Sequence, residues 1–429
     1  MRSRRIAAFV SLALSCGVVA QEGREPGGDL KYIVIISRHG VRAPTWTAEQ
    51  LNRYSSQPWP KWDVNPGELT RHGRLLIKLL GAYDRAYLAG QGLLHSTGCA
   101  DLDHLYIWSD VDQRTIETAA AFAESLLPGC GLKIHSMAHA ASDPIFNPLG
   151  SMGKPDRAMA LASIMGRIGG SPEELVNLHR DAFWTLQQVL LAGGKSQESL
   201  LSAPVSVVAG SGESLVDITG PIRTGSTLAE NLLLEFADGR KGDDLGWGRL
   251  NAENLRQILM IHTAYAELAR RTPYLARQRG SNLLFLVLAS LEQAAARKPA
   301  SGALGEAENR VLLLAGHDTN ISNLSGMLGL NWLLPGYPAD DTPPGGALVF
   351  ELRQRGAEPP RVRAYYMAQS LDQMQNAVPL TLQRPLLRAP IFIPGCSGSS
   401  EGYECTWPAF RRVAEGAIDP TMVSRISPR

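Results

Sequence analysis

The sequence predicts an α/β fold in which a mixed, mostly parallel sheet is flanked by helices and interrupted by an inserted α-helical cap. Three apolar segments, "YIVIIS" (32–37), "LYIWS" (105–109) and "RVLLLAG" (310–316), are each followed by a polar loop and a helix-like pattern. Continuous apolar runs of this kind are typical of parallel strands that helices cover on both faces. Between the second and the third run, residues 154–295 form long amphipathic stretches rich in Ala, Leu, Glu and Arg, which predicts helices.

The C-terminal third adds two more strand-like segments, at 347–354 and 362–369, separated by the turn-forming "RGAEPP". We expect them to form an antiparallel hairpin at the sheet. The resulting organisation is an α/β domain made of residues 21–153 and 296–429, with residues 154–295 inserted as the helical domain.

The first 20 residues have the pattern of a signal peptide. A basic "MRSRR" precedes an apolar run that is too short for a membrane span, and small residues lead up to Ala20, which favours cleavage there. A lipid anchor on Cys16 is the alternative, although Ala13 stands where a lipoprotein signal prefers Leu. We therefore expect an exported protein of the periplasm, without membrane attachment once residues 1–20 are removed.

The cysteines agree with export to an oxidising compartment. Without Cys16 an even number remains, Cys99, Cys130, Cys396 and Cys405, and four cysteines allow three pairings. Proximity in the sequence suggests Cys99–Cys130 and Cys396–Cys405, while four free thiols are the alternative. The absence of any CxxC pair in the sequence disfavours a zinc ribbon or a thioredoxin-like redox site.

The charge balance limits the class of ligand. The chain has 42 basic and 41 acidic side chains and a formal net charge of +1, which argues against a nucleic-acid partner because such binding needs a concentrated basic face. An anionic ligand must instead be held by a local group of arginines. No assembly element is evident, so we expect a monomer.

The tripeptide "RHG" occurs twice, and its surroundings separate the two copies. In "YIVIISRHGVRAPT", His39 directly follows a predicted strand, at the sheet edge where α/β proteins bind ligands. Arg38 and Arg42 flank it, and their planar guanidiniums suit phosphate oxygens. A neutral imidazole between two permanent cations is a candidate nucleophile for phosphorus.

The second copy, in "GELTRHGRLLIKLLG", has the features of a helix start. Thr70 is placed to cap an amphipathic helix, and His72 then lies in the first helical turn. We interpret His72 as a structural residue.

Two other predicted strand ends carry polar residues towards the same edge. Arg114 follows the strand at 105–109 in "SDVDQRT", while His317 and Asp318 follow the strand at 310–316 in "AGHDTN". A carboxylic acid beside a phosphate-binding group can protonate a leaving alkoxide. The convergence of these residues with His39 predicts an active site.

The pattern Arg-His-Gly-x-Arg-x-Pro at 38–44, with His-Asp at 317–318, resembles the histidine acid phosphatases. The resemblance spans nearly the whole mature chain and is closest to the bacterial periplasmic phytases and acid phosphatases, through segments such as "SDVDQRT", "DPIFNPL" and "TPPGGALVFE". It implies phosphomonoester hydrolysis in two steps, without metal or other cofactor. His39 would form a phosphohistidine and Asp318 would protonate the leaving oxygen.

The resemblance also implies the remaining substrate contacts, and it shows one departure. The residues expected to bind the substrate are Arg38, Arg42, Thr45, Arg114, His317 and, in the helical domain, Glu230. After Thr45 related phytases tend to carry Lys, whereas this chain has Trp46, so the phosphate ester could be phytate-like or a sugar phosphate. Because cations stabilise the Asp318 carboxylate, this acid is protonated mainly at low pH, which predicts an acidic optimum.

The sequence also offers four alternatives: a metal site, a nucleotidase, a narrower sugar phosphatase and a binding protein. His135 and His139 have the spacing of a metal-binding helix face, but "LKIHSMAHA" favours a strand, and no metal site is predicted. The chain contains no P-loop sequence, which disfavours a nucleotidase of that type. A narrower sugar phosphatase similar to glucose-1-phosphatase, or a phosphate-ester binding protein without turnover, remains open.

Overall fold

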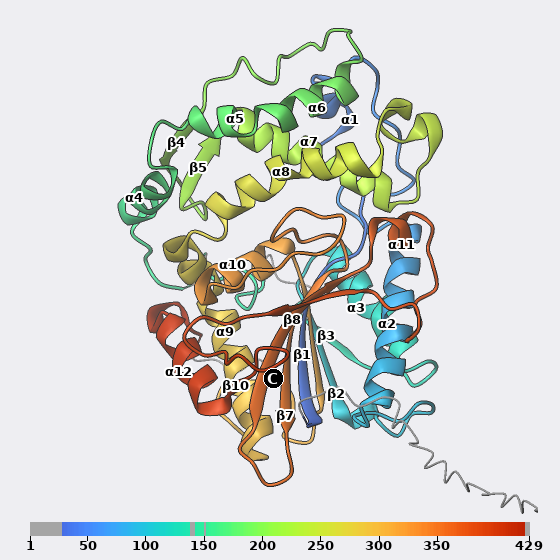
Figure 1. The fold of residues 1–429 in the computed structure, drawn as a ribbon, viewed down its shortest axis with the longest axis vertical. Coiled ribbons are helices and arrows are strands. Elements are labelled where there is room, and N and C mark those ends of the chain that lie inside the picture. Colours follow the sequence, from blue (N-terminus) through green and yellow to red (C-terminus); the bar gives the residue numbers. More distant parts are fainter. Residues whose placement is uncertain (1–27, 138–141, 150–151, 425–429) are drawn as a thin grey trace, which may run out of the picture.

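The computed structural model describes residues 28–137, 142–149 and 152–424. A twisted mixed sheet lies between two layers of helices, and further helices form a separate layer beyond one edge of the sheet (Figure 1). The predicted α/β fold with an added helical layer is therefore confirmed. The predicted signal peptide and His139 lie outside the described residues.

The main sheet has the strand order β10-β8-β7-β1-β6-β2-β3, and β9 pairs with β8. Strands β1, β6, β2 and β3 are parallel neighbours, while β7 to β10 run antiparallel to the strands they pair with. The strands are β1 (Asp29–Arg38), β2 (Leu105–Ser109), β3 (Ile134–Ser136), β6 (Val311–Gly316), β7 (Ala347–Gln354), β8 (Arg361–Ala368), β9 (Leu387–Ile391) and β10 (Cys405–Thr406). The three predicted main strands and the predicted hairpin are thus confirmed.

Both faces of the sheet are buried, which explains the continuous apolar runs. Along β1, Ile33 and Ile35 pack against one group of helices, whereas Val34 and Ile36 belong to the core on the opposite face. The first face is covered by α2 (Arg71–Gly90) and α3 (Gln113–Leu126), and the second by α9 (Pro273–Ala296), α10 (Asp318–Leu328) and α12 (Trp407–Ala417) (Figure 1). A polar side chain at any of these positions of β1 would be buried among apolar side chains on one face of the sheet or the other.

The helical layer is built mainly from the inserted segment. It contains α4 (Arg157–Ile168), α5 (Glu174–Leu178), α6 (Arg180–Leu191), α7 (Pro221–Ala237) and α8 (Ala252–Ala269), with the small hairpin β4 (Ser206–Ala209) and β5 (Val216–Thr219). The last helix of the predicted inserted segment, α9, instead runs along the sheet (Figure 1). The short helices are α1 (Ala48–Asn52), α11 (Leu371–Gln375), η1 (Leu102–His104), η2 (Gly242–Asp244), η3 (Gly246–Gly248) and η4 (Pro420–Met422).

Two disulfides join the cysteines as their proximity in the sequence suggested. Cys99–Cys130 connects the segments that follow α2 and α3, and Cys396–Cys405 ties a loop to β10. Both predicted pairings are confirmed. Across the described ranges, no helix combines the length and the apolar character that crossing a bilayer requires.

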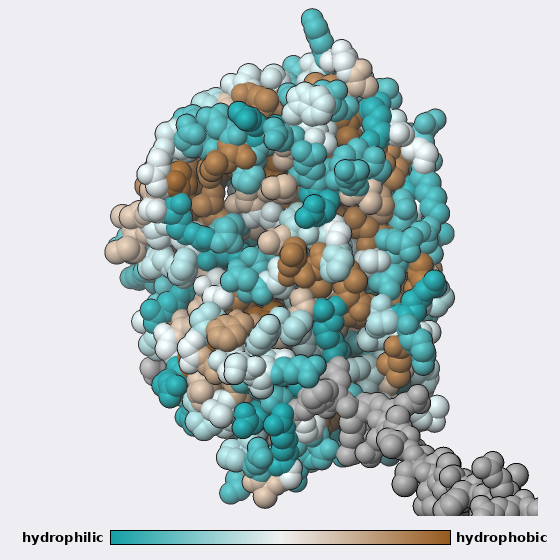
Figure 2. Space-filling view, viewed as in Figure 1, coloured by the Kyte–Doolittle hydropathy of each residue, from teal (hydrophilic) through white to brown (hydrophobic). Residues whose placement is uncertain are grey.

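The visible surface is mixed. On the face shown in Figure 2, hydrophilic residues predominate, and hydrophobic residues gather in small groups, several of them near the junction of the helical layer with the sheet. Isolated apolar groups of this kind are normal on a protein surface that faces water.

The two RHG segments contact each other through their glycines. Thr70 caps α2 by accepting a hydrogen bond from the Gly73 N–H at 2.9 Å, as predicted. A Cβ on Gly73 would lie 2.2 Å from the carbonyl oxygen of Val41, so the first turn of α2 packs directly on the loop after β1. The His72 side chain does not take part in this contact, and its Nε2 lies 2.7 Å from the carbonyl oxygen of Met374. The second RHG therefore supports the loop of the first one.

We expect Gly73→Ala to destabilise the protein by about 1–3 kcal/mol, because the added methyl group forces the loop after His39 to move, and to lower the catalytic activity expected from the sequence as well. Thermal unfolding and initial rates measure the two effects. Gly90→Ala is the matched control, since it lies on the same helix and its new Cβ would have its nearest neighbour, Leu382, at 4.0 Å. Equal effects of the two substitutions would contradict this account.

Candidate active site

The register of the parallel strands brings the predicted residues to one edge. Ala315 of β6 pairs with Ser37 of β1 on one side and with Ser109 of β2 on the other, so the three strands end level with one another. The residues that follow them must then emerge side by side. The rings of His39 and His317 accordingly meet edge to face, with centroids 5.4 Å apart.

His39 is a buried, neutral imidazole. Its Nδ1 lies 2.8 Å from the carbonyl oxygen of Gly40, and because a carbonyl can only accept, Nδ1 carries the proton and Nε2 keeps its lone pair. Burial, followed by the charges of Arg38, His317 and Arg42, holds the pKa of His39 well below its usual value. The imidazole therefore remains unprotonated, and able to act as a nucleophile, in acidic solution.

Arg38 and Arg42 converge on a single carboxylate oxygen, Oε1 of Glu230. Arg38 Nη2 donates to it in a short contact, and Arg42 Nη2 donates at 3.1 Å. Burial alone would raise the pKa of Glu230, but Arg42 and Arg38 lower it to about 2. The two arginines can thus share one anionic oxygen, as proposed from their spacing. Arg38 Nη1 donates to the Thr342 carbonyl oxygen at 2.6 Å.

His317 lies between two carboxylates. Its Nδ1 is 3.2 Å from Asp110 Oδ2, and its Nε2 is 2.9 Å from Asp112 Oδ2. Burial disfavours the charged ring, but the hydrogen bonds to Asp110 and Asp112 outweigh it and raise the pKa of His317. Asp112 Oδ2 also accepts from Arg114 Nη2 at 2.6 Å, so this carboxylate links two cations. No role was predicted for Asp110 or Asp112 from the sequence, although both lie in the "SDVDQRT" segment.

Asp318 opens α10, and both of its carboxylate oxygens have partners. Oδ1 accepts from the Thr319 N–H at 2.8 Å, and Oδ2 accepts from Arg270 Nη1 at 2.5 Å. Burial would raise the pKa of Asp318, but Arg270, Arg38 and His262 hold it well below its usual value. This stabilisation was predicted to come from the arginines at the strand ends, whereas the cation with the largest effect is Arg270, the C-cap residue of α8.

The group formed by Asp110, Asp112 and His317 also has the composition of a metal site. The ligand atoms of these three side chains lie within 4.8 Å of one another. A bound cation would have to replace the protons that His317 donates to both carboxylates, and it would lie next to the guanidinium of Arg114. We therefore interpret the group as hydrogen-bonded support for a cationic His317. His135 lies on β3, where its ring stacks on Tyr106 at 4.4 Å.

The surroundings of the site have Arg279 on one flank and an aromatic side chain on the other. On the His317 side, a cavity of about 360 Å³ is lined by Arg279 as well as by Asp110 and Asp112, and the buried Nε of Arg279 has no hydrogen-bond partner within the described residues. On the other side, Thr45 is exposed, and Trp46 lines an apolar cavity of about 260 Å³. The arrangement suits a phosphate ester with a bulky leaving group.

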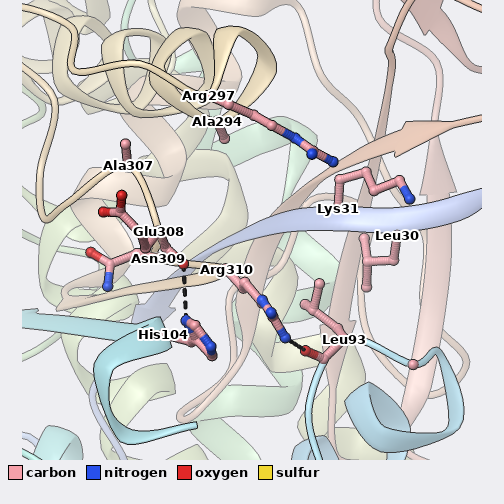
Figure 3. A pocket seen from close by; sticks show the side chains of 11 residues that line it. Leu30, Lys31, Leu93, His104, Ala294, Arg297, Ala307, Glu308, Asn309 and Arg310 are labelled. Atoms are coloured by element: carbon pink, nitrogen blue, oxygen red, sulfur yellow. Dashed lines mark hydrogen bonds between the residues drawn. The ribbon is translucent and has the colours of Figure 1, made fainter.

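A further cavity lies in a different part of the molecule. A cavity of about 520 Å³ lies at the opposite edge of the sheet, beside the first residues of β1 and β6 (Figure 3). There Arg310 donates to the Leu93 carbonyl oxygen at 3.1 Å, and His104 Nδ1 lies 3.1 Å from the Glu308 carbonyl oxygen. It contains none of the residues that follow the three aligned strands, so we do not regard it as the active site.

Comparison with known proteins identifies the family. The sequence model of the histidine phosphatase superfamily (branch 2) matches residues 29–156 and 232–367. This chain belongs to that family. The unmatched residues 157–231 contain α4 to α6 and the small hairpin, so the family match is interrupted within the helical layer.

Individual relatives agree over nearly the full length. The phytase AppA of Escherichia coli is 37% identical over 410 residues, covering 92% of this chain and 94% of the relative. A glucose-1-phosphatase of Salmonella typhimurium is 28% identical over 409 residues, covering 93% and 95%. The solved structure of Hafnia alvei phytase with myo-inositol hexakis sulphate has a TM-score of 0.84 at 34% identity, covering 94% of this chain and all of that one. The predicted family is confirmed.

We expect Glu230→Gln to lower the melting temperature in phosphate-free buffer, because removing one partner of a buried ion pair costs about 3–5 kcal/mol. Added orthophosphate should then raise the melting temperature more in the variant than in the wild type, since the anion replaces the negative charge that Arg38 and Arg42 have lost. Differential scanning calorimetry with a phosphate titration measures both effects. Glu253→Gln, an exposed position on α8, should leave both values unchanged, and a variant that gains no extra response to phosphate would contradict the assigned role.

Proposed function

We propose that this protein is an exported acid phosphatase that hydrolyses phosphomonoesters through a phosphohistidine on His39. Membership of the family and the phytase and glucose-1-phosphatase relatives support hydrolysis of phosphate esters. The observation that carries the choice of nucleophile is the hydrogen bond from His39 Nδ1 to Gly40, which leaves the Nε2 lone pair among buried cations. The enzyme class is phosphoric monoester hydrolase.

The reaction has two displacements at phosphorus. In the first, His39 Nε2 forms a bond to phosphorus, the ester P–O bond breaks, and Asp318 gives its proton to the departing oxygen. In the second, water attacks the phosphohistidine, the P–N bond breaks, and Asp318 takes a proton from the water. Arg38, Arg42, Arg114 and His317 would hold the phosphoryl oxygens, since their charges oppose the negative charge of the phosphoryl group. None of these steps requires a metal or another cofactor.

The leaving group is proposed to be an inositol phosphate or a sugar phosphate. Arg279, beside His317, could hold a second phosphate group, which favours a phytate-like substrate. Trp46, on the opposite flank, offers an aromatic face and no charge, which favours a sugar ring. A narrower sugar phosphatase is therefore the second candidate, while a binding protein without turnover is the alternative outside the enzymes.

The proposed location is the periplasm, and the proposed state is a monomer that acts on a small molecule and not on nucleic acid. The two disulfides support an oxidising compartment. The expected signal peptide, residues 1–20, can be tested by sequencing the N-terminus of the secreted protein, where we expect Gln21.

The proposed nucleophile is tested by trapping the phosphorylated form of the protein. We expect wild-type protein, mixed with an excess of labelled p-nitrophenyl phosphate and denatured in alkali, to retain label on a histidine in the peptide that contains His39. His39→Ala should lose the label and at least 10³-fold in kcat, because no other group replaces the lone pair.

His72→Ala is the matched control and should keep both the label and most of the turnover. Turnover retained by His39→Ala would contradict the proposed nucleophile, and absence of turnover in wild-type protein under all conditions would support the binding protein.

Substrate preference is tested at Trp46. We expect Trp46→Lys to raise kcat/KM for phytate relative to glucose 1-phosphate by about two- to five-fold, corresponding to the 0.5–1 kcal/mol of a partly exposed charge pair. Trp184→Lys, an exposed tryptophan on α6, adds the same charge to the outer layer and should leave the ratio unchanged. An unchanged ratio in Trp46→Lys would show that residue 46 does not contact the leaving group.

A further inference from the structure

Arg270 is a largely buried cation at the site that none of the strand-end motifs contains. It follows α8 as its C-cap residue, and its guanidinium pairs with Asp318, which lies 48 positions further along the chain. The exposed fractions of the two side chains are 16% and 10%, so water screens this pair only weakly. Arg270 thus binds the carboxyl group whose proton the proposed reaction requires.

The pairing with Arg270 favours the carboxylate of Asp318 over its protonated form. An arginine side chain is a permanent cation that offers only donors, and Oδ2 of Asp318 accepts its hydrogen bond while Oδ1 accepts from the Thr319 N–H at the start of α10. A neighbouring cation and hydrogen bonds to the charged form both stabilise a carboxylate. Protonation of Asp318 therefore gives up the attraction between its charge and that of Arg270.

Other charges around Asp318 do not reverse this preference. From β1 Arg38 acts on the carboxylate, and from α8 the ring of His262 approaches it, with Nε2 4.0 Å from Oδ2. Two acids act in the opposite sense, Glu230 on α7 and Asp341 in the loop before β7, but Glu230 is already paired with Arg38 and Arg42. The start of α10 adds the positive end of a helix dipole. Arg270 is the one cation among them that touches Oδ2 directly.

We propose that Arg270 is a positioning residue that keeps Asp318 ionised at rest and thereby confines efficient turnover of alkyl phosphates to acidic solution. The inference rests on the proposed role of Asp318 as the general acid. A cation at this distance lowers the pKa of a carboxyl group by about 1–3 units. Because the acid is active only when protonated, lowering its pKa moves the alkaline limb of the rate profile towards lower pH. Removing the cation should move that limb upwards.

The test compares pH profiles of kcat/KM for wild type and Arg270→Gln with two substrates. Glycerol 2-phosphate has an alkoxide leaving group that needs the proton, whereas p-nitrophenyl phosphate has an acidic phenol that leaves without it. For glycerol 2-phosphate we expect the alkaline limb of Arg270→Gln to lie about 1–3 pH units higher, with the value on the acidic plateau within a few-fold of wild type. For p-nitrophenyl phosphate we expect the alkaline limb to move very little. Titration of His39 or His317 would shift the limb for both substrates, so a shift for glycerol 2-phosphate alone identifies Asp318 as the group that titrates.

Two further variants complete the design. Arg270→Lys keeps the cation and should retain the wild-type limb. Arg256→Gln removes an exposed arginine from the same helix and should change neither substrate's profile. These two results would separate the charge at position 270 from a general effect of net charge or of altering α8.

Two outcomes would overturn the inference. If Arg270→Gln kept normal phosphohistidine labelling and an unchanged limb for glycerol 2-phosphate, Arg270 would not control the acid, although the proposed reaction would stand. If KM rose many-fold for both substrates while the limb stayed in place, Arg270 would be a substrate ligand instead. Failure of the proposed function itself has a different signature, because the wild-type protein would then form no labelled phosphohistidine.

Discussion

The burial of two arginines next to one histidine is the constraint on which the rest of the site depends. Arg38 is fully buried and Arg42 nearly so, and charges in such surroundings must be paired. Glu230 supplies the countercharge from a helix almost 200 residues further along the chain. A phosphoryl group offers the same kind of oxygen to the same donors. The resting protein therefore holds the two guanidiniums in place with a carboxylate, where the substrate would present its own anion.

This pairing gives the inserted helical layer a role beyond covering the site. Helix α7 carries Glu230 to Arg38 and Arg42. Helix α8 carries His262 and is followed by its C-cap residue Arg270, and both side chains lie next to Asp318. The sheet supplies the groups proposed to act on phosphorus, and the helices supply charges that set their ionisation. Ion pairs join the helical layer to the sheet layer, Glu230 with Arg38 and Arg42 and Arg270 with Asp318. Each of the two layers therefore depends on the other for the balance of its buried charges.

The two histidines show how position decides ionisation within one site. Their rings are 5.4 Å apart, yet the pKa of His39 is held well below its usual value and that of His317 is raised. His39 has a backbone carbonyl as partner and cations around it, whereas His317 has a carboxylate at each ring nitrogen. A neutral imidazole and a cationic imidazole can therefore coexist in acidic solution, as the roles proposed for His39 and His317 require.

Local sequence determined the strands, the helix start at Thr70 and the residues that follow β1, β2 and β6, because burial periodicity and capping depend on near neighbours. It also suggested both disulfides, through cysteines at most 31 positions apart. Only the tertiary structure decided that Glu230 would bridge Arg38 and Arg42, that Asp110 and Asp112 would enclose His317, and that Arg270 rather than its neighbour Arg271 would meet Asp318. Those contacts depend on how α7 and α8 lie across the edge of the sheet. No local pattern carries that information, since an arginine at a helix end has the same neighbours in sequence whether it faces a carboxylate or water.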